Sequence, residues 1–369
     1  MTARLLLAAV LAVTLGSCVT DPGERGRVAL RLITINDFHG NLEAAPTLQL
    51  VLTDPGETAG AQPMRVRVGG AAALAGIAKQ LRKGSRNSLM VAGGDLIGAA
   101  PLPSTLFRHE STVEILGDIG LDVSSLGNHE FDAGEIELQR IIRGGCAANP
   151  PASTSISCAE GRYKGTRYTY IAANVRDSGG KPIVAPYVIR TFEGIPVGFI
   201  GAVTKTTPQL VVPSGIAGLT FGDEADAVNR SAEELRAQGV RALVAVFHEG
   251  MELGTPDKRG DWNDITCPDA RGALLDIARR LAPEIRVVIS GHTHQGYRCE
   301  LDGRLLIQST SYGRGIGVVD VELDRSTGAM LPPVRSINLP VLNEQTDPAQ
   351  RAKLIAATPE PFAAALREA

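Results

Sequence analysis

The feature of the sequence that most constrains the fold is its alternation of short, apolar β-rich runs with segments of helical periodicity. This alternation is typical of a layered α/β domain, in which helices cover a sheet. The expected strands are residues 28–35, 88–94, 122–127, 168–175, 196–203, 241–248, 285–291, 304–310 and 316–323. The expected helices are residues 71–84, 111–120, 133–145, 223–239 and 269–282, several of which end in glycine, as a C-cap would.

Length and composition set the limits for such a domain. A chain of 369 residues with 44% hydrophobic content can bury one large core or two moderate ones. Residues 50–68 and 144–166 break the alternation, and we expect loops there. The formal charge of −3 mixes both signs without long like-charge runs, so we expect no nucleic-acid partner.

The N-terminus has the layout of a secretory signal. Arg4 precedes an apolar stretch too short to span a bilayer comfortably, and small residues follow before Cys18. "LGSC" (15–18) also resembles a bacterial lipobox, which would make residues 1–17 a lipoprotein signal and Cys18 the lipidated first residue. The alternative is an ordinary cleaved signal. Either way we expect an exported protein, held at the cell envelope by a lipid anchor if the lipobox is used.

The remaining cysteines favour disulfides. They are even in number, which in an exported chain indicates disulfide bonds rather than metal thiolates, and none has C-x-x-C spacing. Four cysteines allow three connectivities. We expect neighbours in sequence to pair, Cys146 with Cys158 and Cys267 with Cys299.

Polar side chains follow five of the expected strands at their C-terminal ends. This is where open α/β sheets gather ligands. The residues are Asp37 and His39, then Asp95, then Asn128, His129 and Asp132, then His248, and last His292 and His294.

The residue types indicate a catalytic metal site. Carboxylate, imidazole and amide oxygen suit Zn²⁺, Mn²⁺, Co²⁺ or Mg²⁺, and the absence of thiolate argues against a purely structural zinc. The ligands are too many for one ion. They fit two divalent ions about 3.5–4 Å apart, a geometry used for in-line displacement at phosphorus.

Five blocks of this sequence resemble those of the metallophosphoesterase superfamily, in order, with intervals close to those of the bacterial 5′-nucleotidase/UDP-sugar hydrolase branch. They are "NDFHGNLE" (36–43), "GGDLIGAAP" (93–101), "GNHEFDAG" (127–134), "VFHEG" (246–250) and "SGHTHQ" (290–295). The resemblance implies a four-layer α/β/β/α sandwich with two mixed sheets, over a catalytic domain of residues 28–340 after a linker of residues 18–27.

The resemblance also assigns the ligands. It implies that Asp37, His39 and His294 hold one metal, that Asn128, His248 and His292 hold the other, and that Asp95 bridges them. The nucleotidase branch often has glutamine where His294 stands, which leaves the metal preference of the first site open. His129 and Asp132 would form a catalytic dyad outside the metal shell, in which Asp132 orients the imidazole.

The implied function is hydrolysis of a phosphate ester, most simply that of a nucleotide by a 5′-nucleotidase-like phosphomonoesterase. The same core could act on a cyclic nucleotide or on the pyrophosphate of a nucleotide sugar, and a metal-binding lipoprotein without activity is the third alternative. Members of the branch usually continue into a substrate-binding domain. The tail, residues 341–369, resembles the helical start of a linker to it, so a separate substrate-binding polypeptide is a further expectation.

Other residues near the motifs receive simpler interpretations. His109 has no partner motif and is expected at the surface. Glu130 is expected to be a spectator beside the ligand Asn128. Trp262 is expected in an exposed loop, and the glycines of residues 93–98 are expected to let the backbone pass close to the metals.

Overall fold

The structure is a computed structural model that describes residues 26–51, 63–147, 156–159, 161–254 and 261–369. The proposed signal 1–17, Cys18 and most of the linker 18–27 lie outside the described residues. Export and lipidation therefore stay predictions. Within the described ranges, no helix is long and apolar enough to cross a membrane.

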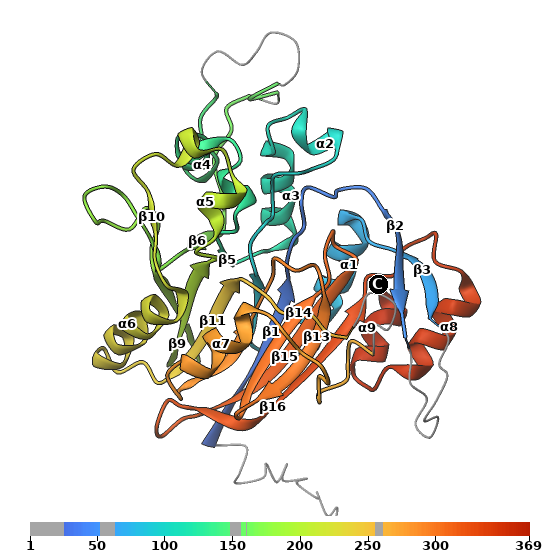
Figure 1. The fold of residues 1–369 in the computed structure, drawn as a ribbon. Helices are drawn as coiled ribbons and strands as arrows, with labels where there is room; N and C mark the ends of the chain where they lie inside the picture. Colours follow the sequence, from blue (N-terminus) through green and yellow to red (C-terminus); the bar gives the residue numbers. More distant parts are fainter. Residues whose placement is uncertain (1–25, 52–62, 148–155, 160, 255–260) are drawn as a thin grey trace, which may run out of the picture.

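Two six-stranded mixed sheets form the centre of the molecule (Figure 1). The first sheet has the order β16 (Met330–Pro340), β15 (Gly315–Asp324), β1 (Arg27–Ile35), β4 (Ser88–Ala92), β5 (Val123–Ser125), β6 (Thr169–Ile171). The second has the order β13 (Gly296–Leu301), β14 (Arg304–Ser309), β12 (Ile285–Ile289), β11 (Ala242–His248), β9 (Ile195–Val203), β8 (Tyr187–Phe192). In both sheets the parallel strands lie together. Antiparallel strands close both edges of the second sheet and one edge of the first, whose other edge is the parallel strand β6.

Helices cover the outer faces of both sheets. The first sheet packs against α1 (Ala71–Lys83), α3 (Glu110–Ile119), α4 (Gly134–Arg143), α8 (Pro348–Ala357) and α9 (Phe362–Glu368). The second packs against α6 (Glu224–Ala237) and α7 (Ala273–Arg280). The shorter elements are α2 (Leu102–Thr105), η2 (His129–Phe131), α5 (Thr207–Leu210), η3 (Pro213–Ile216) and the two-stranded sheets β2 (Ala45–Leu50)–β3 (Met64–Val68) and β7 (Val175–Arg176)–β10 (Thr220–Phe221).

The core lies in three layers, as strand β1 illustrates. Leu30 and Leu32 join the apolar cluster between the sheets, whereas Ile33 and Ile35 join the cluster beneath the helices. Successive side chains of a strand point to opposite faces, so a strand buried on both faces reads as a continuous apolar run. The four-layer α/β/β/α architecture is therefore confirmed.

Most of the expected elements are confirmed, with two corrections. The strand expected at 168–175 is interrupted between β6 and β7. There the Asn174 amide bonds the backbone of Val203, through Nδ2–H to the carbonyl (2.6 Å) and through Oδ1 to the amide (3.0 Å), in place of strand pairing. The loop expected at 50–68 was wrong at its end, because Met64–Val68 is strand β3, in which Val66 and Val68 are buried and the intervening arginines exposed. Strands β8, β13 and β16 were not anticipated.

Both expected disulfides are present. Cys146 and Cys158 have Cα atoms 5.4 Å apart, and Cys267 and Cys299 have Cα atoms 5.6 Å apart. The first bond closes the segment after α4. The second ties the segment before α7 to the edge strand β13.

The tail helices pack against the helical layer that covers the first sheet. Leu354 of α8 and Leu366 of α9 are buried in the same cluster as the side chains of α1. The carbonyl of Glu368 accepts a hydrogen bond from Gln80 of α1 (3.1 Å). These two helices are therefore part of the helical layer that covers the first sheet.

We predict that Leu366→Ala lowers the free energy of unfolding by about 2–4 kcal/mol, because it leaves a cavity beneath α9. The matched control is Lys353→Ala on α8, an exposed position whose loss should change stability by less than about 0.5 kcal/mol. Urea unfolding followed by circular dichroism measures both. Equal stability of the two variants would show that the tail is not packed as described.

Candidate active site

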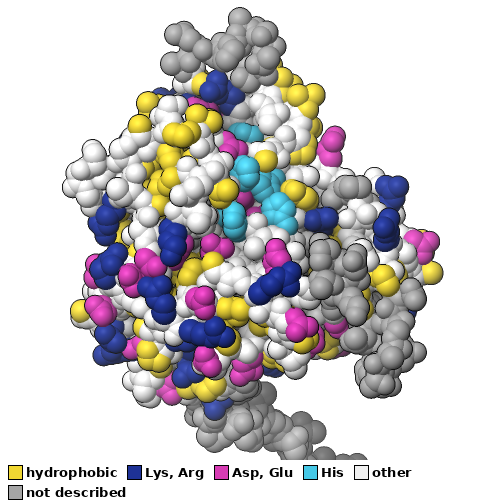
Figure 2. Space-filling model, in the orientation of Figure 1, with side chains coloured by type: hydrophobic (Ala, Val, Ile, Leu, Met, Phe, Trp, Pro, Cys, Tyr) yellow, Lys and Arg dark blue, Asp and Glu magenta, His cyan; other side chains and the backbone are white. Residues whose placement is uncertain are grey.

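The candidate site lies where the C-terminal ends of five central strands meet. Three of these strands, β1, β4 and β5, belong to the first sheet, and β11 and β12 belong to the second. Figure 2 shows histidine side chains gathered in one hollow of the face above these ends. The polar residues predicted from the sequence are thus brought together from both sheets.

Glycines permit the loops of the two sheets to approach this closely. A Cβ on Gly93, after β4, would lie 2.6 Å from the carbonyl oxygen of Ser290, after β12. A Cβ on Gly94 would lie 2.7 Å from Nδ1 of His248 and would require a backbone φ of +82°. Any larger residue would push the sheets apart at this point. That the glycines also let the backbone pass close to the metals stays a prediction.

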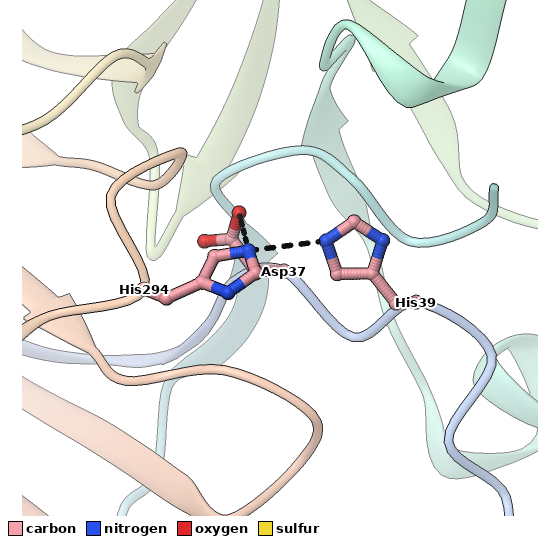
Figure 3. Close-up of side chains that lie close together, drawn as sticks. All are labelled: Asp37, His39 and His294. Carbon is pink, nitrogen blue, oxygen red and sulfur yellow. Dashed lines mark hydrogen bonds and ion pairs between the residues drawn. The ribbon is translucent and has the colours of Figure 1, made fainter. Parts of the chain in front are cut away.

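Asp37, His39 and His294 form the first cluster (Figure 3). The Nε2 atoms of His39 and His294 face one another at 3.2 Å, and Nε2 of His294 lies 3.4 Å from Oδ1 of Asp37. Asp37 and His39 are buried, whereas the His294 side chain is 34% exposed. The cluster is therefore reached from the solvent on the His294 side.

The second cluster contains Asp95, Asn128, His248 and His292. Nε2 of His248 lies 3.0 Å from Oδ2 of Asp95 and 3.0 Å from Oδ1 of Asn128. A ligand atom of His292 lies within 4.8 Å of those of Asp95 and His248. The same Oδ2 atom of Asp95 also lies 3.7 Å from Nε2 of His39 in the first cluster.

The donor set fits divalent metal ions. The Nδ1 atoms of His39 and His248 bond the carbonyl oxygens of Gly98 (2.9 Å) and Gly93 (2.8 Å), so each ring turns Nε2 to the cluster. Two oxygen acceptors lie 3.0 Å from Nε2 of His248, Oδ2 of Asp95 and Oδ1 of Asn128. Such a convergence of electron pairs is stable only with positive charge at its centre.

The pKa shifts of His248 and Asp95 also indicate that positive charge is stabilised at this position. Burial opposes a charged imidazole at His248, but the adjacent Asp95 carboxylate outweighs it and raises the pKa of His248 to about 10. Burial likewise favours a neutral Asp95, yet His248 holds the pKa of Asp95 well below its usual value. A bound cation would be stabilised by the same carboxylate and would compete with a proton for the imidazole, as metal binding to imidazole requires.

His129 and Asp132 form a dyad beside the clusters. Nδ1 of His129 lies 2.8 Å from Oδ2 of Asp132, and its backbone N–H donates to Oδ1 of Asp95 (2.9 Å). The ring centroid lies 5.0 Å from that of His39. The Asp132 hydrogen bond, opposed by partial burial, raises the pKa of His129. The dyad therefore presents an imidazole that can donate a proton to the region of the two ligand clusters.

Backbone strain concentrates at the same loops. Asp37, His39, Asp95, His292 and His294 all have φ between +47° and +73°, a region that non-glycine residues rarely occupy. Each such residue costs about 1–3 kcal/mol and persists where the surroundings enforce it. The loops are thus held in place to aim these side chains.

Glu130 is not a spectator, contrary to expectation. Its buried carboxylate accepts the backbone N–H groups of Gly127 (2.6 Å), Asp95 (3.0 Å) and Leu96 (2.8 Å), which joins the loop after β4 to the loop after β5. Burial and the neighbouring Asp95 charge raise the pKa of Glu130 to about 7. A carboxylate at the end of a buried apolar run, next to a ligand, is the signal that could have indicated this role.

Two other contributors were missed, although Asn36 lies within the block of residues 36–43. Asn36 donates from Nδ2 to Oδ2 of Asp37 (2.6 Å) and accepts from the backbone N–H of Ser309 (2.8 Å), so it fixes the first ligand. The Tyr312 ring packs against those of His39 and His294, at centroid distances of 5.6 and 5.1 Å. These contacts join distant segments, which spacing alone does not reveal.

Two residues expected at the surface are partly or fully buried. His109 is half-buried, and its Nδ1 lies 2.8 Å from Oγ of Ser104. Trp262 is 8% exposed and lies against Gly296 of β13 and Gly315 of β15. Neither expectation could be corrected from the sequence, because the partners are remote or lack a distinctive type.

The chain belongs to the calcineurin-like phosphoesterase family, whose signature matches residues 30–296. The fold agrees: the phosphoesterase YfkN from Bacillus subtilis superimposes with a TM-score of 0.63 at 20% identity, over 92% of this chain and 99% of that one. A 5′-nucleotidase precursor from Thermus thermophilus gives a TM-score of 0.62 at 23% identity, over 92% and 57% of the respective chains. The class of enzyme that this domain defines is metal-dependent phosphoester hydrolase.

Sequence relatives carry nuclease and nucleotidase names. Endonuclease YhcR of Bacillus subtilis is 38% identical over 309 residues, which are 84% of this chain and 23% of that protein. A probable 5′-nucleotidase of Treponema pallidum is 28% identical over 349 residues, 88% of this chain and 50% of that protein. The chain thus spans about a quarter and half of the length of these two relatives.

We predict that Asp132→Asn lowers the pKa of His129 in the metal-free protein, because the hydrogen bond to a charged partner is the main cause of its raised value. The protonated ring would then persist only to a lower pH. Histidine NMR titration of EDTA-treated protein measures this. Glu135→Gln, which removes a nearby carboxylate in the first turn of α4, is the control and should leave the titration in place. An unshifted His129 in Asp132→Asn would contradict the dyad.

Proposed function

We propose that the protein is an exported phosphomonoesterase that acts on nucleotides with two divalent metal ions. The observation that carries this proposal is the position of Asp95, a buried carboxylate that faces both metal-ligand clusters beside a histidine–aspartate dyad. A shared carboxylate between two such clusters suits a pair of ions working on one phosphoryl group.

The clusters suggest how the ions would be held. Asp37, His39 and His294 would hold one ion, Asn128, His248 and His292 the other, and Asp95 would contact both. When bound, divalent ions lower the pKa of water and neutralise charge on phosphoryl oxygens. Their identity is left open by this donor set.

The dyad supplies the protein's own part of the chemistry. With Nδ1 bonded to Asp132, His129 turns Nε2 towards the clusters, where it can donate a hydrogen bond to a phosphoryl oxygen or a proton to the departing alkoxide. Asp132 keeps the ring oriented and stabilises its charged form. Because the Asp132 side chain is 38% exposed, the departing group can leave on this side.

The substrate class rests on the relatives. A probable 5′-nucleotidase among them supports a nucleotide monoester. Endonuclease YhcR supports a phosphodiester as the second candidate, alongside the cyclic nucleotide and nucleotide-sugar alternatives. A panel with Mn²⁺, Co²⁺ and Zn²⁺ that offers a nucleoside monophosphate, a cyclic nucleotide, a nucleotide sugar and single-stranded DNA separates them by phosphate or product release.

Export is supported by the two disulfides, since such bonds form and persist in oxidising compartments. Together with the signal-like N-terminus, they favour a location at the cell envelope. Mass spectrometry of the mature protein, for a lipid on Cys18, would test the anchor.

We predict that Asp95→Asn reduces both metal content and phosphate release, the latter by at least about 100-fold, because the shared charge is lost. Inductively coupled plasma mass spectrometry and a phosphate assay measure the two effects. Asp276→Asn, at an exposed carboxylate of α7, is the matched control. Full turnover by Asp95→Asn would refute the proposal.

We predict that His129→Ala reduces turnover by about 10²–10⁴-fold while metal content stays that of the wild type, because its role is proton donation rather than ligation. The same two assays decide this. Loss of metal in His129→Ala would instead make it a ligand.

A further inference from the structure

A cavity of about 270 Å³ lies next to the dyad. It is bounded by His129 and Asp132, by Arg108 and His109 from the turn before α3, and by Leu138 and Ile141 of α4. Its wall is mostly apolar, and its size is near the small end of ligand pockets. His129 thus separates the metal clusters on one side from this cavity on the other.

The turn that carries Arg108 and His109 is strained. Both residues have positive φ, 49° and 65°, and the turn is held by a hydrogen bond from the His109 N–H to the Ser104 carbonyl (2.8 Å). Adjacent non-glycine residues in this conformation are costly and occur where the surroundings enforce them, often at functional sites. Here the result is that both side chains line the cavity.

Two hydroxyl groups lead to the ring of His109. Oγ1 of Thr112 donates to Oγ of Ser104 (2.7 Å), and Oγ of Ser104 lies 2.8 Å from Nδ1 of His109. With the Ser104 hydroxyl as the donor to Nδ1, the ring carries its hydrogen on Nε2. Burial lowers the pKa of His109 to about 4, so the ring is neutral at ordinary pH.

The charged groups of the cavity already have partners. The carboxylate of Glu130 accepts backbone N–H groups, among them that of Gly127 (2.6 Å). Asp132 is bonded to His129, and Glu137 is bonded to Arg108 (3.2 Å) and Arg140 (2.8 Å). In the described part of the chain, Nε2–H of His109 is without a hydrogen-bond acceptor. A ligand for this cavity is therefore uncharged and apolar, with one acceptor atom.

We propose that the cavity is the subsite for the leaving group of the ester, which takes a neutral heterocyclic ring such as a nucleobase and bonds it through Nε2–H of His109. This inference rests on the proposed function, because it takes the phosphoryl group to lie on the metal side of His129. An apolar wall covers the ring, and His109 selects rings with an acceptor. All six histidines of the chain thereby serve one site.

Two variants of the full-length protein test the subsite. Thr105→Trp fills the cavity from its exposed rim, and His109→Phe keeps a ring but removes the donor. The control is Ile136→Trp, which adds the same indole to α4 at a side chain that is 89% exposed and outside the cavity.

The first readout compares adenosine 5′-monophosphate with glycerol 2-phosphate, which has no ring. We expect the ratio of their kcat/KM values to fall about threefold to tenfold in both cavity variants, as the loss of one neutral hydrogen bond or of ring burial would give, and to stay unchanged in Ile136→Trp. An unchanged ratio in Thr105→Trp and His109→Phe would overturn the assignment.

The second readout is independent of hydrolysis. Saturation-transfer NMR with adenosine alone should give a signal with wild-type protein that is lost in Thr105→Trp and kept in Ile136→Trp. If the wild type hydrolyses no ester, the proposed function fails, whereas loss of this signal in Thr105→Trp still supports the subsite. An equal adenosine signal in Thr105→Trp and the wild type overturns the subsite whatever the turnover.

Discussion

The site depends on one buried carboxylate that is contacted from both sheets. Asp95 follows β4 of the first sheet, yet its charge is balanced by His248 at the end of β11 in the second. Its backbone N–H is held by Glu130, and its Oδ1 accepts the N–H of His129. Without such compensation a buried charge would be strongly unfavourable, so the loops must meet at this residue for the sandwich to close at this end.

That requirement explains the features around it. The glycines at 93 and 94 exist where a side chain would collide with the opposite sheet, and the positive φ values of the ligands are tolerated because hydrogen bonds on every side enforce them. The imidazoles of His39 and His248 are oriented by backbone carbonyls. The contacts within the protein therefore fix a loop geometry that suits cations.

Much of this could be predicted from the sequence, and the reason is local. Strands such as β1 and β11 are largely apolar and end at or just before a proposed ligand, so the sequence shows the strand and the site residue together. Glu130 was misjudged and Asn36 was missed because their roles depend on partners elsewhere in the chain, the backbone of Leu96 for Glu130 and that of Ser309 for Asn36. His109 was misjudged although its partner Ser104 is close in sequence, because serine is not a distinctive signal. Edge strand β16 and the interruption at Asn174 likewise depend on neighbours that no short window of sequence contains.

The proposed metal ligands extend from Asp37 to His294 in the sequence, so nearly the whole domain must be folded before they come together. An unfolded or half-folded chain offers no comparable site, and ions bound to the native state would stabilise it by mass action. Metal binding would accordingly occur late in folding, and it would stabilise only chains in which the two sheets have packed correctly. A defect far from the hollow, in either sheet, would then be registered as poor metal retention.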